Sequence, residues 1–280
     1  VRQVTVSNGP RAGWSRLTLI LAQPMLVAQA GLETSQDSGA RLHIRLRAAS
    51  DAEFSAALSP MRDGLVPSQP TIPAVVPQDR ARPVVALDPG HGGLDPGAER
   101  DGYKEADLVL LFALELREML LREGRVDVFM TRERDEFVPL PHRMSRARMA
   151  GADVFISIHA DALAEGTGSA SGATVYTLSE TGSDAASAAL AAQHDRADLL
   201  AGVDLARSDD VVADLLMDLA RRETDPRSAA LADALVAGLD AAGVELHSRP
   251  RLEANFTVLR APDYPSVLLE IGYMSQGGDL

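Results

Sequence analysis

Two apolar, strand-like segments of this sequence, 84–88 and 154–159, lead to a histidine. The first is followed by a turn with three glycines around His91, and the second ends in His159. Glycine lets the backbone pack closely around an imidazole ring, and α/β proteins bind ligands at the carboxyl ends of parallel strands. If the two strands are neighbours, both imidazoles lie at the same edge of one sheet.

Glu105 is a third candidate ligand, in the first turn of a long amphipathic helix predicted near residues 104–123. Two histidines and one glutamate form a ligand set of catalytic zinc, which keeps a fourth position open for water or substrate. The 280-residue chain has no cysteine, so any metal must be held by His, Asp or Glu. A single histidine at a strand end is more often structural, so the predicted Zn²⁺ site depends on His91, Glu105 and His159 together. A phosphate-binding loop at 88–93 is less favoured, because neither Gly-Lys-Ser/Thr nor G-x-G-x-x-G is present.

A further strand, predicted over 267–271, places Glu270 within an apolar run. Burial raises the pKa of a carboxyl group and a nearby cation lowers it, so a glutamate beside a zinc-bound water is suited to moving protons. The alternative is a glutamate on an edge strand that faces solvent. Three more residues are candidates either for orienting the metal ligands or for a structural role, namely Asp88, Arg132 and Asp161. Three histidines show no ligand pattern, namely His43, His142 and His247.

The spacing of apolar residues predicts the elements that position these side chains. Strands alternate with helices over residues 84–280, which is typical of an α/β layered domain with a mostly parallel central sheet flanked by helices. The remaining predicted strands are 126–130, 173–178 and 256–260, and the remaining predicted helices are 140–150, 184–200, 210–222 and 228–242. We expect the C-terminal end of this domain to be incomplete.

The first 83 residues differ from the rest in charge and pattern. They hold nine Arg and six acidic residues, whereas the whole chain has a net charge of −13. Alternating apolar residues at 15–21 and 40–46 predict strands of a small β module over 1–64. The stretch 65–83 contains five prolines and predicts an extended linker.

Composition also excludes some partners. The acidic balance argues against nucleic acid, and no stretch reaches the ~18 apolar residues that a membrane span needs. Residues 17–30 have some features of an export signal, but Gln23 and Pro24 interrupt the apolar run. We therefore expect the chain to have no membrane span.

Five motifs of this sequence resemble, in order and spacing, those of the zinc-dependent N-acetylmuramoyl-L-alanine amidases of the bacterial cell-division type, the Amidase_3 family. The motifs are VALDPGHGG at 85–93, Lys104-Glu105, Thr131-Arg132, SIHAD at 157–161 and LLEIGYMS at 268–275. The resemblance covers about residues 83–280. It implies cleavage of the amide bond between N-acetylmuramic acid and L-alanine in peptidoglycan, with zinc held by His91, Glu105 and His159 and with Glu270 as the catalytic carboxylate.

The resemblance implies three further properties. The β module is similar to the latter part of an AMIN domain, which targets such amidases to the envelope, so we expect a periplasmic protein. Residues 183–203 correspond to an extra helix that covers the zinc site until a LytM-type activator removes it, for daughter-cell separation. Where relatives often carry a glutamate in that helix, this chain has His194, a residue able to bind zinc.

Two other functions stay open from the sequence. A zinc carboxypeptidase or deacetylase acting on the cell wall uses the same ligand set, but a carboxypeptidase releases single amino acids instead of intact stem peptides. A non-catalytic peptidoglycan-binding protein is the other alternative. The presence of all four expected active-site residues argues against a degenerate site.

Overall fold

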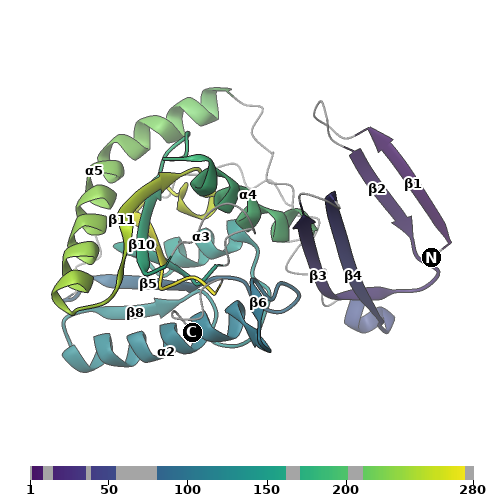
Figure 1. Ribbon diagram of the computed structural model, residues 1–280, viewed down its shortest axis with the longest axis horizontal. Coiled ribbons are helices and arrows are strands. Elements are labelled where there is room, and N and C mark those ends of the chain that lie inside the picture. Colours follow the sequence, from purple (N-terminus) through teal and green to yellow (C-terminus); the bar gives the residue numbers. More distant parts are fainter. Residues whose placement is uncertain are drawn as a thin grey trace.

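The computed structural model describes residues 2–8, 15–35, 39–54, 81–161, 171–200 and 211–274 (Figure 1). The N-terminal part consists of two antiparallel hairpins. The first pairs β1 (Gln3–Asn8) with β2 (Ser15–Ile20), and the second pairs β3 (Met25–Ser35) with β4 (Gly39–Ala48). The strands predicted at 15–21 and 40–46 are β2 and β4.

β1 and β3 were not predicted. β3 contains the second half of the stretch 17–30 that has features of an export signal, and there the backbone pairs with β4 except for an irregularity between Val27 and Gln29. Most of the predicted linker, 65–80, lies outside the described residues. No helix among the described residues is long and apolar enough to cross a membrane.

A six-stranded sheet forms the centre of the second part of the chain, in the order β11-β10-β12-β9-β5-β8. Neighbouring strands are parallel except for the antiparallel pair β10 and β12, which confirms the predicted mostly parallel sheet. The strands are β5 (Val84–Pro89), β8 (Asp127–Met130), β9 (Val154–His159), β10 (Ala173–Leu178), β11 (Leu246–Ala254) and β12 (Ser266–Glu270). A short hairpin of β6 (Glu99–Arg100) and β7 (Tyr103–Lys104) precedes the first long helix.

Helices cover both faces of this sheet (Figure 1). α2 (Glu105–Glu123) and α5 (Val211–Ala241) pack on one face, in a core that includes Val109, Ala113 and Ala232. α3 (Leu140–Met149), α4 (Ala185–Leu200) and the 3-10 helix η1 (Thr257–Leu259) belong to the core of the other face. The layered α/β fold is therefore as predicted.

Three predicted elements differ from the structure. The helices expected at 210–222 and 228–242 form the single helix α5, because the helix continues through Pro226 and packs along the sheet. The strand expected at 256–260 is the 3-10 helix η1, and the actual strand is β11, just before it. β11 was missed because it contains Pro250 and alternates poorly, which the sheet tolerates since β11 is an edge strand.

Candidate metal centre

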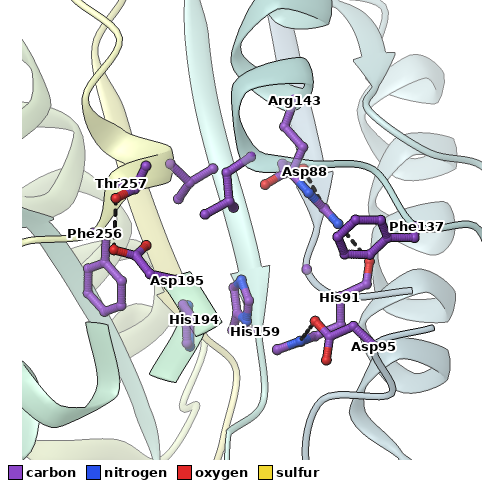
Figure 2. Close-up of a pocket in the computed structure, with 13 residues that line it drawn as sticks. Asp88, His91, Asp95, Phe137, Arg143, His159, His194, Asp195, Phe256 and Thr257 are labelled. Atoms are coloured by element: carbon purple, nitrogen blue, oxygen red, sulfur yellow. Dashed lines mark hydrogen bonds and ion pairs between the residues drawn. The ribbon is translucent and has the colours of Figure 1, made fainter. Parts of the chain in front are cut away.

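His91 and His159 lie side by side at the carboxyl edge of the sheet (Figure 2). β5 and β9 are neighbouring parallel strands, and Gly90 N donates to Ile158 O across them at 2.9 Å. The two imidazole centroids are 4.8 Å apart with the rings nearly perpendicular. This approach requires glycine at position 90, because a Cβ atom there would lie 2.2 Å from Cε1 of His159.

Glu105 reaches both histidines from the first turn of α2. Its Oε1 atom lies 3.1 Å from Nε2 of His91 and 3.0 Å from Nδ1 of His159. The side chain is fully buried, and the backbone N–H groups of Ala98 and Ala160 donate to its two oxygens. Burial opposes ionisation, but the two histidines outweigh it and hold the pKa of Glu105 well below its ordinary value. The structure thus brings together the three residues proposed as metal ligands.

The donor atoms at this edge fit a divalent metal. One ligand atom from each of four residues lies within 4.8 Å of the others, and the four are His91, His159, Asp161 and His194. Glu105 is not in this group, but its Oε1 atom lies 3.1 Å and 3.0 Å from nitrogens of His91 and His159. The buried Nε2 atom of His91 lies 3.1 Å from Oε1 of Glu105 but forms no hydrogen bond within the described part of the chain, which is costly unless another group binds it. Imidazole nitrogens and carboxylate oxygens are the ligands that zinc takes in cysteine-free sites.

Asp95 is a site residue that the sequence analysis missed. Its Oδ2 atom lies 2.6 Å from Nδ1 of His91 (Figure 2), and its Oδ1 atom accepts from Gly97 N. A carboxylate on one ring nitrogen orients a metal-binding imidazole and makes the other nitrogen more basic. Burial lowers the pKa of His91, but Asp95 and Glu105 together outweigh it and raise that pKa well above its ordinary value. The sequence feature that could have identified Asp95 is its position four residues after His91, in a glycine-rich turn.

Glu270 is fully buried at the end of β12 and is paired in register with His159. Its Oε2 atom accepts a hydrogen bond from Asp161 N at 3.1 Å, and its Oε1 atom has no hydrogen-bond partner among the residues that the structure describes. Burial and the nearby carboxylates of Asp161 and Glu105 raise the pKa of Glu270 well above its ordinary value. Glu270 does not face solvent, since β12 lies inside the sheet.

Asp88 and Arg132 support the turn around His91 without touching its ring. Arg132 donates to the carbonyl oxygens of Pro89, Gly90 and Ala106. Asp88 accepts from hydroxyls on β9 and on the segment after β8, and forms a buried ion pair with Arg143 at 2.9 Å.

Arg143, which the sequence analysis did not identify, connects Asp88 to the turn. It donates from the same guanidinium to the carbonyl oxygens of Pro89 and His91. Asp88 and Arg132 therefore position the backbone of the ligand turn.

The family model described as N-acetylmuramoyl-L-alanine amidase, Amidase_3, matches residues 85–280 of this chain, which is more than half of its length. The chain belongs to the Amidase_3 family. The chain is 39% identical over 194 residues to the N-acetylmuramoyl-L-alanine amidase AmiA of Escherichia coli, covering 69% of this chain and 66% of that protein. It is 41% identical over 196 residues to AmiC of Neisseria meningitidis, covering 69% of this chain and 46% of that protein.

The matched region thus spans two thirds or less of the length of these relatives. Among solved structures, AmiC2 of Nostoc punctiforme is 26% identical, with a TM-score of 0.45 over 70% of this chain and 83% of that chain.

In this Amidase_3 chain, α4 closes the candidate centre. His194 of α4 stacks on His159 with ring centroids 4.0 Å apart, and its Nε2 atom contacts the carboxylate of Asp161. Asp195, the next residue, accepts a hydrogen bond from Thr257 at 2.9 Å (Figure 2). The cavity left beside the histidines has a volume of about 20 Å³, which is room for about one water molecule.

Two further histidines, His142 and His247, lie apart from this cluster. His142 is in the first turn of α3, and His247 is on the edge strand β11, where its Nδ1 atom lies 3.0 Å from Arg249 O. The side chain of His43 is outside the described residues. Neither His142 nor His247 belongs to the group of possible metal ligands found in the described part of the chain.

Proposed function

We propose that this chain is a zinc-dependent peptidoglycan amidase. It hydrolyses the amide bond between the lactyl group of N-acetylmuramic acid and L-alanine. The observation that supports this proposal most is the meeting of His91, Glu105, His159 and Glu270 at one edge of the sheet. The family and the names of its curated relatives favour this substrate over those of a carboxypeptidase or deacetylase.

His91, Glu105 and His159 would hold the zinc. When bound, zinc polarises a carbonyl and lowers the pKa of a coordinated water towards ~7. Glu270 takes the proton of the attacking water and delivers it to the leaving nitrogen of L-alanine. Burial and its carboxylate neighbours raise the pKa of Glu270, whereas a bound zinc ion would lower it. A carboxyl group held between these effects can accept a proton and then donate it near neutral pH.

Replacement of Glu270 tests this assignment. We expect Glu270→Gln to keep the zinc content of the parent chain and to lose at least ~100-fold in hydrolysis of purified sacculi, as for loss of a general acid–base. Glu253→Gln, an exposed glutamate on β11, is the matched control and should leave the rate unchanged. Mass spectrometry of the products should find intact stem peptides with a free L-alanine amine. Release of single amino acids would identify a carboxypeptidase instead.

The closed cavity supports a resting state in which α4 blocks the centre, and we propose that His194 occupies the fourth ligand position there. The proposed inhibitory segment is 183–203, of which 201–203 lie outside the described residues. A partner, proposed as a LytM-type activator, shifts the equilibrium to the open state by binding it more tightly. His194→Ala should raise basal hydrolysis, whereas an unchanged basal rate would contradict this role.

We also propose domain boundaries for this chain and a cellular location for the enzyme. Residues 1–64 would form a partial AMIN-like module, 65–83 a linker and 84–280 the catalytic domain. The module would direct the enzyme to peptidoglycan in the periplasm, where the enzyme would act in daughter-cell separation. In a sedimentation assay with purified sacculi, a chain lacking residues 1–64 should bind less than the full chain. Equal binding of the two would exclude a targeting role for the module.

A further inference from the structure

The carboxylate of Asp161 is bound on both oxygens by side chains of α4. Nε2 of Gln193 donates to Oδ1 at 3.0 Å, and Nε2 of His194 contacts Oδ2. The Asp161 side chain is fully buried at the carboxyl end of β9. α4 therefore supplies the side-chain donors that satisfy this buried acid.

Substrate cannot reach the centre while these contacts persist. The cavity beside the histidines holds about 20 Å³, far less than the several hundred Å³ of a typical ligand pocket. His194 lines this cavity, so α4 must move before a muramoyl peptide binds, and its movement takes Gln193 and His194 away from Asp161. A carboxylate without a donor is costly, so in the open state either water or the substrate must donate to Asp161 in place of Gln193 and His194.

We propose that Asp161 binds the N–H group of the scissile amide, and that the carboxamide of Gln193 occupies this position in the closed state. The Gln193 side chain presents an amide N–H to Asp161, the same type of donor as the bond that the enzyme is proposed to cleave. This inference rests on the proposed function, and it makes Asp161 a substrate-binding residue as well as the anchor of α4.

The surroundings of Asp161 suit this role. Its backbone N–H donates to Glu270 at 3.1 Å, so a nitrogen held by its carboxylate lies close to the group that protonates the leaving amine. A carboxylate oxygen of Asp161 also lies within 4.8 Å of ligand atoms of His91 and His159. An amide with its N–H on Asp161 can therefore direct its carbonyl oxygen toward the metal ligands.

The first arm of the test opens the site in the full chain. We expect Gln193→Ala together with His194→Ala to raise basal hydrolysis of a soluble muramoyl peptide at least tenfold. The same pair should speed hydrogen exchange of the α4 backbone. An opened chain with neither effect contradicts the inference, because these two side chains would then not be what occupies the amide position.

The second arm measures the N–H contact by calorimetry in this opened chain carrying Glu270→Gln, so that no ligand is turned over. Two ligands are compared, the muramoyl peptide and its analogue with L-lactate in place of L-alanine, in which an ester oxygen replaces the N–H. We expect the amide to bind at least tenfold more tightly, since a hydrogen bond to a charged group is involved. Asp161→Ala should reduce this ratio to within about twofold, with the zinc content unchanged.

Asp195→Ala is the matched control, because it removes a carboxylate of α4 that lines the cavity beside the histidines. Unlike Asp161, Asp195 accepts no hydrogen bond from the side chain of Gln193 or His194, and its replacement should leave the ratio intact. If the ratio of amide to ester affinity is the same with and without the Asp161 side chain, this inference is wrong but the proposed function is not affected. Loss of zinc in Asp161→Ala also contradicts it and makes Asp161 a metal ligand. If the opened chain hydrolyses no muramoyl peptide, the proposed function fails and this inference fails with it.

Discussion

Replacing Asp88 by Asn tests how the turn that carries His91 is held in place. Asp88 and Arg143 are an ion pair with side chains only 1% and 3% exposed. Asn has nearly the same shape, but it removes the charge that compensates the buried guanidinium. Breaking one partner of a buried pair typically costs about 3–5 kcal/mol.

The structure puts this substitution in the upper part of that range. Asp88 also accepts hydrogen bonds from the hydroxyls of Thr131 and Ser157, and the NH₂ group of an asparagine must face one of these donors or the guanidinium. Arg143 keeps only backbone carbonyl oxygens, those of Val138, Pro89 and His91. We therefore expect a loss of about 4–5 kcal/mol in the free energy of unfolding.

Urea unfolding followed by far-ultraviolet circular dichroism measures this change. The control is Asp233→Asn, which breaks the exposed pair with Arg251 and should cost about 0–1 kcal/mol. A loss below about 1 kcal/mol for Asp88→Asn, at an unchanged slope with urea, would refute the reasoning. It would mean that backbone carbonyls alone satisfy Arg143.

The same pair predicts an acid dependence. Burial alone would raise the pKa of Asp88, but Arg143 and the two hydroxyls outweigh it and lower that pKa below its ordinary value. A lowered folded-state pKa gives stability that is present above the unfolded pKa of ~3.9 and is lost as the pH falls towards the folded value. The parent chain should therefore lose this contribution below about pH 4, and Asp88→Asn should lack that component of the pH dependence.

Three other predictions concern the metal centre. Gly90→Ala should displace the ring of His159, lower the metal content and cost about 1–3 kcal/mol, because its Cβ would lie 2.2 Å from that ring. Gly238→Ala is the control, because an added Cβ in α5 meets no described atom within 4 Å. Thermal unfolding of both variants should show that Gly238→Ala is neutral or stabilising. Asp95→Asn should weaken zinc binding about 10–100-fold in a chelator competition, and unchanged affinity would show that its 2.6 Å contact to His91 does not orient the ring. Exhaustive chelation should abolish hydrolysis and lower the melting temperature, with both restored by added zinc, whereas full activity after chelation would exclude a metal mechanism.

Much of the sheet was predictable because its strands are buried on both faces. β9 and β10 have the predicted bounds, since continuous apolar runs between turn residues allow few other interpretations. β11 was not predictable in this way, because an edge strand tolerates Pro250 and polar residues that break the pattern. The length of α5 was not predictable either, since packing against the sheet outweighs the local effect of Pro226.

The candidate site was predictable where a strand end or a helix start fixes a side chain. His91, His159 and Glu105 are in such positions, and the structure brings them within contact distance. Asp95 and Arg143 were missed because their roles depend on loop and helix placements that no sequence period encodes.

The backbone of His91 adopts a φ of +57°, a left-handed conformation that is uncommon for residues other than glycine, although Asn, Asp and His take it more often than the rest. Holding a non-glycine residue there costs of order 1–3 kcal/mol. The rest of the domain must supply that free energy, and a glycine at this position would relieve the strain while removing the imidazole. Selection for stability alone would therefore favour replacing His91 by glycine, and selection for the function of its imidazole opposes this replacement.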